Sequence, residues 1–145
     1  MLHFRKTSKK PKSDLENLEG KLWEIFSVYI RLRDSDDQGI CKCFTCNFRA
    51  HWKKMDAGHG IPRQHKATKF SEINNNAQCG RCNAFEGGMR EEYKKAMDKK
   101  YGPQTWDKML IASKQTIHFS AALLENNIKY YSEQVRILKE QKGML

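Results

Sequence analysis

Two pairs of cysteines have the spacing that proteins use to hold a metal ion. Cys43 and Cys46 form the first C-x-x-C pair, and Cys79 and Cys82 form the second after thirty-two intervening residues. Four thiolates are enough to close a tetrahedral zinc site that leaves no position for water. A disulfide framework is the other use of such cysteines, but paired C-x-x-C spacing in an intracellular protein favours metal. We therefore predict one structural Zn²⁺, with Cys41 left over as a small residue beside the first pair.

A second set of polar residues has the types needed to hydrolyse a phosphodiester. Asp56 and His59 lie near the middle of the segment between the cysteine pairs, Asn74 lies near its end, and Asn83 directly follows the last cysteine. Histidine suits the role of general base because its unperturbed pKa is about 6.5. Oxygen ligands suit a catalytic Mg²⁺ or Mn²⁺, which would hold the scissile phosphate. Each residue alone is equally typical of a loop or turn, so the prediction of a nuclease site depends on their order.

Length and charge limit the class of protein. A chain of 145 residues is one small domain, or one domain with a helical extension. Its net charge of +10, from 27 basic and 17 acidic residues, indicates a polyanionic partner such as DNA. No apolar run approaches the roughly 20 residues of a membrane span, and residues 1–12 contain no hydrophobic signal region. We therefore predict an intracellular protein with no membrane partner.

The first third of the chain must supply a helix that supports the site. Residues 1–12 form a basic arm, which is either a solvated tail or a loose phosphate-binding segment. Apolar residues then recur at three- and four-residue steps from Asp14 to Arg33, which predicts a helix with one core face. Ser13 or Asp14 can cap its start, and basic residues close its last turn.

Short strands and three further helices are predicted for the remainder. Strands are expected within residues 51–58 and 69–77, with a loop at 60–68 between them. Helices are expected at 82–101, with an irregular first turn at Gly87-Gly88, and at 103–113 and 120–141. The last helix has an apolar seam at steps of four and three residues, which packs either on its own domain or on a partner. The fold class expected is α+β.

Two segments resemble a known nuclease motif. D-A-G-H-G-I-P-R at 56–63 and F-S-E-I-N-N-N-A-Q-C-G-R-C-N at 70–83 are similar to the HNH, or ββα-metal, finger with structural zinc. The chain resembles the NinG (Rap) family of phage recombination proteins more closely, over roughly residues 15–110. Its marks are F-S-V-Y-I-R-L-R-D at 26–34, C-F-T-C at 43–46, D-A-G-H at 56–59, N-N-N-A-Q-C-G-R-C-N at 74–83 and Y-G-P at 101–103.

The resemblance implies a fold, an activity and a location. It implies a zinc-bound ββα-metal (HNH-like) finger flanked by α-helices, in a nuclease for branched DNA that includes Holliday junctions and D-loops. The location implied is the cytoplasm of a bacterial host, where phage or host recombination proteins are possible partners and a homodimer is possible. The domain division expected is a basic arm at 1–12, a helix plus nuclease domain at 13–113 and a C-terminal helical extension at 114–145.

The resemblance also implies roles for particular residues. His59 matches the general base, Asn83 matches the metal ligand on the helix, and Asn74 matches the asparagine that braces the loop carrying the histidine. HNH fingers commonly have a metal-binding acid immediately before the histidine, whereas this sequence has Gly58. Because alternate strand residues share a face, Asp56 is either a ligand that reaches the Mg²⁺ or Mn²⁺ over that glycine or an ordinary strand residue.

Basic residues after the histidine complete the expected site, and two other functions remain open. Arg63, Lys66 and Lys69 are predicted to contact DNA phosphates without distinguishing bases. The first alternative is a non-catalytic four-cysteine zinc module that binds DNA, which would explain the zinc and the charge but not the order of the polar residues. The second is an interaction scaffold that uses the last helix and shows no salt-dependent affinity for DNA.

Overall fold

The computed structural model describes residues 10–85 and 87–145. The described residues form five α-helices, α1 (Asp14–Arg33), α2 (Lys66–Lys69), α3 (Arg90–Tyr101), α4 (Thr105–Ser113) and α5 (Ala121–Gln141). They also form four strands, β1 (Ile40–Lys42), β2 (Arg49–His51), β3 (Asp56–His59) and β4 (Asn75–Gln78). A 3-10 turn, η1 (Trp52–Lys54), precedes β3, and a π-helical segment, η2 (Arg81–Phe85), follows β4. The fold class is α+β, as expected.

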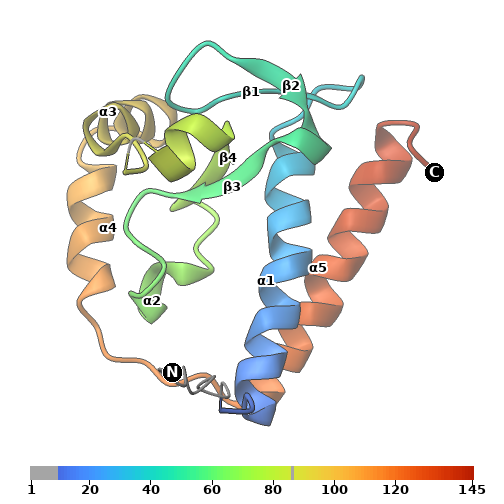
Figure 1. Ribbon diagram of the computed structural model, residues 1–145, viewed down its shortest axis with the longest axis vertical. Helices are drawn as coiled ribbons and strands as arrows, with labels where there is room; N and C mark the ends of the chain where they lie inside the picture. Colours follow the sequence, from blue (N-terminus) through green and yellow to red (C-terminus); the bar gives the residue numbers. More distant parts are fainter. Residues whose placement is uncertain (1–9, 86) are drawn as a thin grey trace, which may run out of the picture.

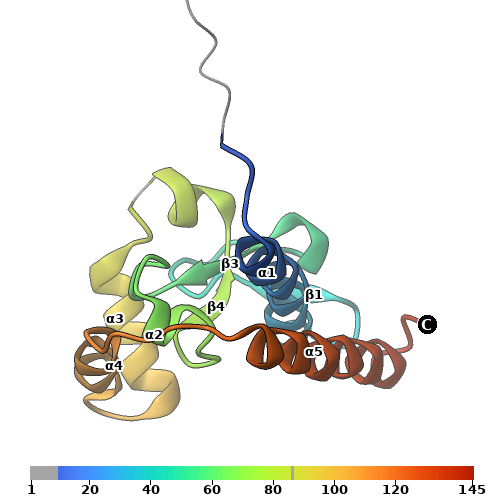
Figure 2. The ribbon, with the colours of Figure 1, turned by 90° about the horizontal axis from the view of Figure 1, so that it is seen from below.

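The strands pair as two separate antiparallel sheets. β1 pairs with β2, and β3 pairs with β4 so that Asp56 lies opposite Gln78 and His59 lies opposite Asn75. In Figures 1 and 2, β3 and β4 lie between α1 on one side and α3 with α4 on the other. The strands that carry the predicted site are therefore held between two groups of helices.

Helix α1 forms as the sequence predicts. Ser13 Oγ accepts a hydrogen bond from the Glu16 amide (3.2 Å), and the Glu16 carboxylate accepts one from the Ser13 amide (3.1 Å). This reciprocal pair satisfies two amides that the first turn of a helix leaves unpaired. Leu22, Phe26 and Ile30 are buried on one side of the helix, where each removes apolar surface from water.

Helix α5 runs parallel to α1 and alongside it (Figure 1). Its seam is buried at Leu124, Tyr131 and Val135, and the ring of Tyr131 meets Phe26 edge-on at a centroid distance of 4.9 Å. Of the two alternatives for this seam, packing on its own domain is therefore the one found. Residues of α5 share two hydrophobic clusters with residues of α1.

The strands differ in position from the predicted ranges. The segment 51–58 does not form one strand, because the His51 ring accepts a hydrogen bond from the Lys53 amide (3.3 Å) and the chain turns through η1 before β3 begins. The segment 69–77 begins in α2 and forms a strand only from Asn75. There the Asn75 side chain donates to the carbonyl groups of Lys69 and Ser71, which holds the turn that precedes the strand.

The helix predicted at 82–101 is interrupted, which corrects the sequence prediction. Gly87 and Gly88 have φ angles of +61° and +80°, and Met89 follows at +56°. Three consecutive residues with positive φ end a right-handed helix, and glycine adopts this conformation at little cost. The chain therefore leaves η2 and starts α3 anew at Arg90. No helix among the residues described is long and apolar enough to cross a membrane.

Candidate functional site

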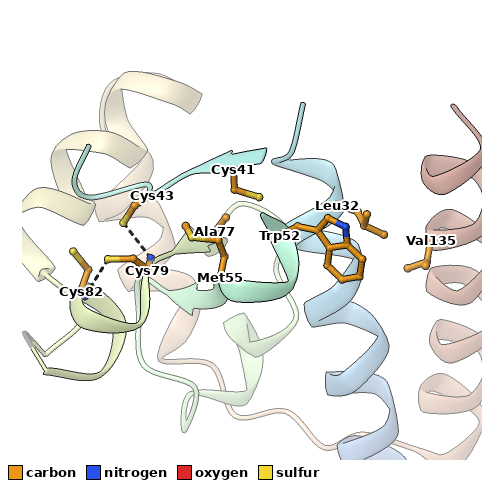
Figure 3. Close-up of a cluster of buried hydrophobic side chains, with 9 residues drawn as sticks. All are labelled: Leu32, Cys41, Cys43, Trp52, Met55, Ala77, Cys79, Cys82 and Val135. Atoms are coloured by element: carbon orange, nitrogen blue, oxygen red, sulfur yellow. Dashed lines mark hydrogen bonds between the residues drawn. The ribbon is translucent and has the colours of Figure 1, made fainter. Parts of the chain in front are cut away.

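The four cysteines of the C-x-x-C pairs come together at one end of the strands. Their Sγ atoms all lie within 4.8 Å of one another, and Cys46 Sγ is 3.7 Å from Cys79 Sγ. A tetrahedron of sulfurs about 2.3 Å from zinc has edges of about 3.8 Å. Figure 3 shows the sulfurs of Cys43, Cys79 and Cys82 facing one another. This group could hold a zinc ion.

Backbone amides orient three of these sulfurs. The Cys79 amide donates to Cys43 Sγ (3.2 Å), the Phe48 amide donates to Cys46 Sγ (3.4 Å), and the Cys82 amide donates to Cys79 Sγ (3.5 Å). Amide donors favour the thiolate form that binds zinc.

The fifth cysteine, Cys41, lies outside the group. It is buried, its Sγ donates to the Arg31 carbonyl (3.1 Å), and burial raises its pKa to about 11. Its thiol is therefore protonated near pH 7 and structural in its contacts.

A cleft of about 440 Å³ lies beside the cysteine group, between α1 and β3. Three of the predicted catalytic residues line it, namely Asp56 and His59 from β3 and Asn83 from η2. Arg63, one of the residues predicted to contact phosphate, lines it as well. These predicted residues are up to twenty-seven positions apart in the chain, from Asp56 to Asn83.

Asp56 and Asn83 contact each other directly in this cleft. Asn83 Nδ2 donates a hydrogen bond to Asp56 Oδ2 at 3.2 Å. Asn83 follows Cys82, so its position depends on the cysteine group. Its backbone amide donates a hydrogen bond to the Cys79 carbonyl (3.0 Å). One carboxylate and one amide oxygen are therefore available from adjacent side chains, which is the ligand type that hard divalent cations prefer.

His59 is held in one orientation and one tautomer. Its Nε2 lies 3.0 Å from the Lys69 carbonyl oxygen, which can only accept, so Nε2 carries the proton and Nδ1 carries the free lone pair. The ring stacks on Trp23 of α1 at a centroid distance of 4.8 Å and an interplanar angle of 21°. Burial, with Arg63 and Lys69 adding to the effect, lowers the pKa of His59 to about 4. The ring is therefore neutral near pH 7, as a general base must be.

Asn74 does not line the cleft and instead joins the two ends of the loop that follows His59. Its side chain is fully buried, with Oδ1 accepting from the Ile61 amide (2.7 Å). Its Nδ2 donates to the carbonyl groups of Ile61 (3.0 Å) and Thr68 (3.2 Å). This geometry is that of a brace for the loop, and it keeps the side chain away from any bound substrate.

Gly58, where HNH fingers commonly have an acid, has no room for a side chain. A Cβ built on Gly58 would lie 1.9 Å from Gln78 Oε1 of the facing strand. Gln78 is fully buried, and its Nε2 donates to Thr45 Oγ1 (2.9 Å) and to the Gly88 carbonyl (3.0 Å). An acidic residue at 58 would therefore displace the side chain that ties the first cysteine pair to the segment after η2.

The three basic residues predicted to contact phosphate are placed unequally. Arg63 is exposed, lines the cleft and lies over the Trp23 ring at 5.7 Å. Lys66 is half exposed and lies 3.9 Å from Glu19. Lys69 is placed differently from the other two, because its side chain is 10% exposed and its Nζ forms an ion pair with Glu19 at 2.7 Å. A phosphate could reach Lys69 only after that pair is broken.

Three residues of the cleft that come from α1 were not among the predicted site residues. Trp23, which stacks on His59, and Arg31 lie eight residues apart with Ser27 midway, and all three line the cleft. Residues four apart lie on the same side of a helix, so this stripe was visible in the sequence. It was overlooked because the apolar periodicity of α1 accounts for the helix without it.

Comparisons with known proteins identify a family. Residues 1–141 match the model of the family described as the bacteriophage Lambda NinG protein. No curated protein and no solved structure matches the chain.

Proposed function

The chain belongs to the bacteriophage Lambda NinG protein family, and we propose that it is a metal-dependent endonuclease that acts on branched DNA. The observation that carries the proposal is the cleft, where a neutral, oriented histidine lies with an oxygen-rich pair of side chains. The non-catalytic zinc module would need no such arrangement. In this proposal, β3, β4 and η2 make up an HNH-like finger that the four cysteines hold together.

His59 is the proposed general base. With Nε2–H bonded to the Lys69 carbonyl, Nδ1 is the nitrogen that can take a proton from an attacking water. The stack on Trp23 restricts rotation of the ring, so the lone pair stays aimed in one direction. Burial lowers the His59 pKa, so the free base is the dominant form at neutral pH.

Asp56 and Asn83 are the proposed ligands of a catalytic Mg²⁺ or Mn²⁺. The Asn83 amide nitrogen faces Asp56, so its oxygen is left for another partner, and no residue in the described part of the chain bonds to it. Two protein oxygens are a sufficient set, because Mg²⁺ usually keeps several of its waters. When bound, the cation would neutralise charge on the scissile phosphate and on the leaving oxygen.

The preference for branched DNA comes from the family resemblance, and the affinity for DNA is supported by charge. Three basic side chains, Arg31, Lys53 and Arg63, line the cleft of a chain whose net charge is +10. Such a concentration of positive charge favours a polyanion and makes its binding sensitive to salt. A homodimer, and phage or host recombination proteins, remain proposed partners in the host cytoplasm.

A cleavage assay on matched substrates tests the proposal. Labelled linear duplex, flap and four-way DNA of the same sequence are incubated with the protein, with Mg²⁺ or with EDTA. We expect cuts near the branch with Mg²⁺, slower cutting of the linear duplex and none in EDTA. His59→Ala protein purified in the same way controls for contaminating nucleases. Salt-dependent binding of all three DNAs without any cleavage would favour the zinc-module alternative.

A conservative substitution tests whether Asp56 is a metal ligand. Asp56→Asn keeps the shape of the side chain and its contact with Asn83 but removes the charge that binds a divalent cation. We expect its cleavage rate to rise with Mg²⁺ only at higher concentrations than for the wild type. An unchanged Mg²⁺ dependence would show that Asp56 is an ordinary residue of strand β3 and not a metal ligand.

A further inference from the structure

Helix α1 presents a polar stripe to the cleft as well as an apolar face to the core. Trp23, Ser27 and Arg31 are spaced by four residues, so they lie on one side of the helix and form one wall of the cleft. The opposite wall is β3, with Asp56 at one end and His59 at the other. Trp23 lies at the His59 end, where the two rings stack. Arg31 lies toward Asp56, with which it interacts electrostatically.

The Arg31 guanidinium is held in place by hydrogen bonds from two of its three nitrogens. Its Nε donates to the Ser27 carbonyl (3.0 Å), its Nη1 donates to the Trp52 carbonyl (3.3 Å), and it lies 5.4 Å from the centre of the Trp52 ring. Within residues 10–85 and 87–145, its Nη2 group has no hydrogen-bond partner and no carboxylate lies within ion-pair distance. Asp56 interacts with this cation electrostatically but forms no ion pair with it, so a half-buried charge is left without a direct partner, which is unfavourable. An arriving anion would supply that partner.

Arg33, two residues further along α1, shows what a purely structural arginine looks like in this fold. It bonds to both oxygens of Asp34 (2.8 and 3.2 Å) and to the carbonyl groups of Glu72 and Asn75 (both 2.8 Å). Its donors are therefore occupied by protein groups that tie α1 to the turn before β4. Arg31 has the same side chain and is also partly buried, but it lines the cleft and its Nη2 group has no partner in the part of the chain described.

Lys53 places a second cation beside Arg31. It lines the same cleft, and its Nζ lies 5.7 Å from the centre of the Trp52 ring that Arg31 also contacts. Arg63 lies at the far end of the cleft, over Trp23. β3 extends for about 10 Å from Asp56 to His59, whereas one DNA strand carries a phosphate about every 3.4 Å along its axis. The cations at the two ends would therefore contact different phosphates.

We propose that Arg31 and Lys53 form a phosphate-binding subsite at the Asp56 end of the cleft, so that a DNA strand lies along β3 and is bound on both sides of the reacting position. The subsite rests on the proposed function and deepens it by fixing the path of the strand. A guanidinium can bind two phosphate oxygens at once, and the neighbouring ammonium adds a point charge. Arg63 binds the strand at the His59 end.

Binding measurements without cleavage test the subsite. All variants are made in the His59→Ala protein. Their affinity for four-way DNA is measured by fluorescence anisotropy in EDTA at salt concentrations between about 50 and 200 mM. We expect Arg31→Gln and Lys53→Gln each to weaken binding and to reduce the slope of log affinity against log salt by about 0.9. Arg31→Lys should restore the slope, because it keeps the charge.

A matched control and a stability measurement separate binding from folding. Arg136 on α5 carries the same charge and pairs with Glu133 and Glu140 outside the cleft, so Arg136→Gln should leave affinity and slope unchanged. Urea unfolding reports whether Arg31→Gln perturbs the fold through Trp52, and Lys53→Gln tests the subsite independently. Unchanged slopes for both variants, in a protein that binds DNA, would overturn the subsite and leave the nuclease proposal standing. Absence of DNA binding by the parent protein would overturn both.

Discussion

The cysteine group and the cleft lie side by side but use their polar groups in opposite ways. In the cysteine group, backbone amides approach three of the four sulfurs, and the sulfurs face one another. In the cleft, His59 Nδ1, Asn83 Oδ1 and Arg31 Nη2 have no hydrogen-bond partner in the part of the chain described. The sulfurs of the cysteine group therefore serve the fold, whereas the cleft has polar atoms that a ligand could bind.

Two connections make the cleft depend on the cysteine group. Asn83 follows Cys82 directly, so the last cysteine fixes where the proposed metal ligand begins. Gln78 bonds to Thr45, which lies between the first two cysteines, and to the carbonyl of Gly88 beyond η2. Loss of the zinc should therefore disturb the cleft, while loss of a cleft residue should leave the cysteine group intact. This asymmetry can be tested from both sides.

The largest effect is expected from the cysteine group. Zinc binding in small domains contributes on the order of 10 kcal/mol, which is comparable to the whole stability of a typical domain. We expect Cys79→Ser to lose the zinc and to abolish cooperative unfolding, measured by metal analysis and circular dichroism. Cys41→Ala is the control, because Cys41 lies outside the group and should leave one zinc per chain. A Cys79→Ser protein that keeps its zinc and its unfolding midpoint would contradict the assignment.

A smaller effect, on the order of 2–3 kcal/mol, is expected from the protonation of His59. Burial lowers the pKa of His59 to about 4, below its ordinary value of 6.5. Between these two values the unfolded chain binds a proton that the folded chain does not, so stability is complete above the higher value and falls as the pH decreases. Urea unfolding at about pH 7 and about pH 4.5 should show a larger loss for the wild type than for His59→Gln. Both proteins keep the same cysteines, so an equal loss would mean that His59 is not held neutral.

The smallest effect on stability is expected from Gly58→Ala, which tests the role of Gln78 between the two regions. Gly58→Ala places a methyl group where Gln78 Oε1 lies, and such overpacking typically costs about 1–3 kcal/mol. In a Gln78→Ala background the same substitution should cost less, because the atom it meets is gone. A double-mutant cycle measured by urea unfolding gives the coupling directly. Equal costs in both backgrounds would show that Gln78 does not determine the glycine at this position.

The helices that pack on the core were predictable because their signals are local. Ser13 and Glu16 are the two halves of a capping box, and the apolar steps of α1 and α5 repeat with the period of a helix. β4 was harder because Asn75 and Asn76 are typical of turns yet are fully buried. Asn76 Oδ1 accepts from Arg33, Lys100 and Tyr101, and none of these contacts is visible in the local sequence. Long-range hydrogen bonds thus override the local preference.

The candidate site also combines features that local sequence predicts with features that depend on long-range contacts. The order of Asp56, His59 and Asn83 was sufficient to predict three residues that line one cleft. The ion pair that occupies Lys69 joins it to Glu19, fifty positions earlier, and no local pattern indicates such a pairing. Arg31 was part of a visible stripe, but only its contacts distinguish it from the fully bonded Arg33. Sequence patterns therefore indicate which chemistry is available, and the tertiary contacts decide which side chains are free to perform it.

Cleavage and binding measured together in His59→Ala test most directly whether the cleft is the catalytic site. We expect cleavage of four-way DNA in Mg²⁺ to fall by at least about 10²-fold, the lower limit for a positioned general base. Zinc content, cooperative unfolding and affinity for the same DNA in EDTA should all be retained, because the cysteine group and the cations of the cleft are untouched. Cleavage at the wild-type rate by a folded, DNA-binding His59→Ala protein would contradict the claim that this cleft is the catalytic site.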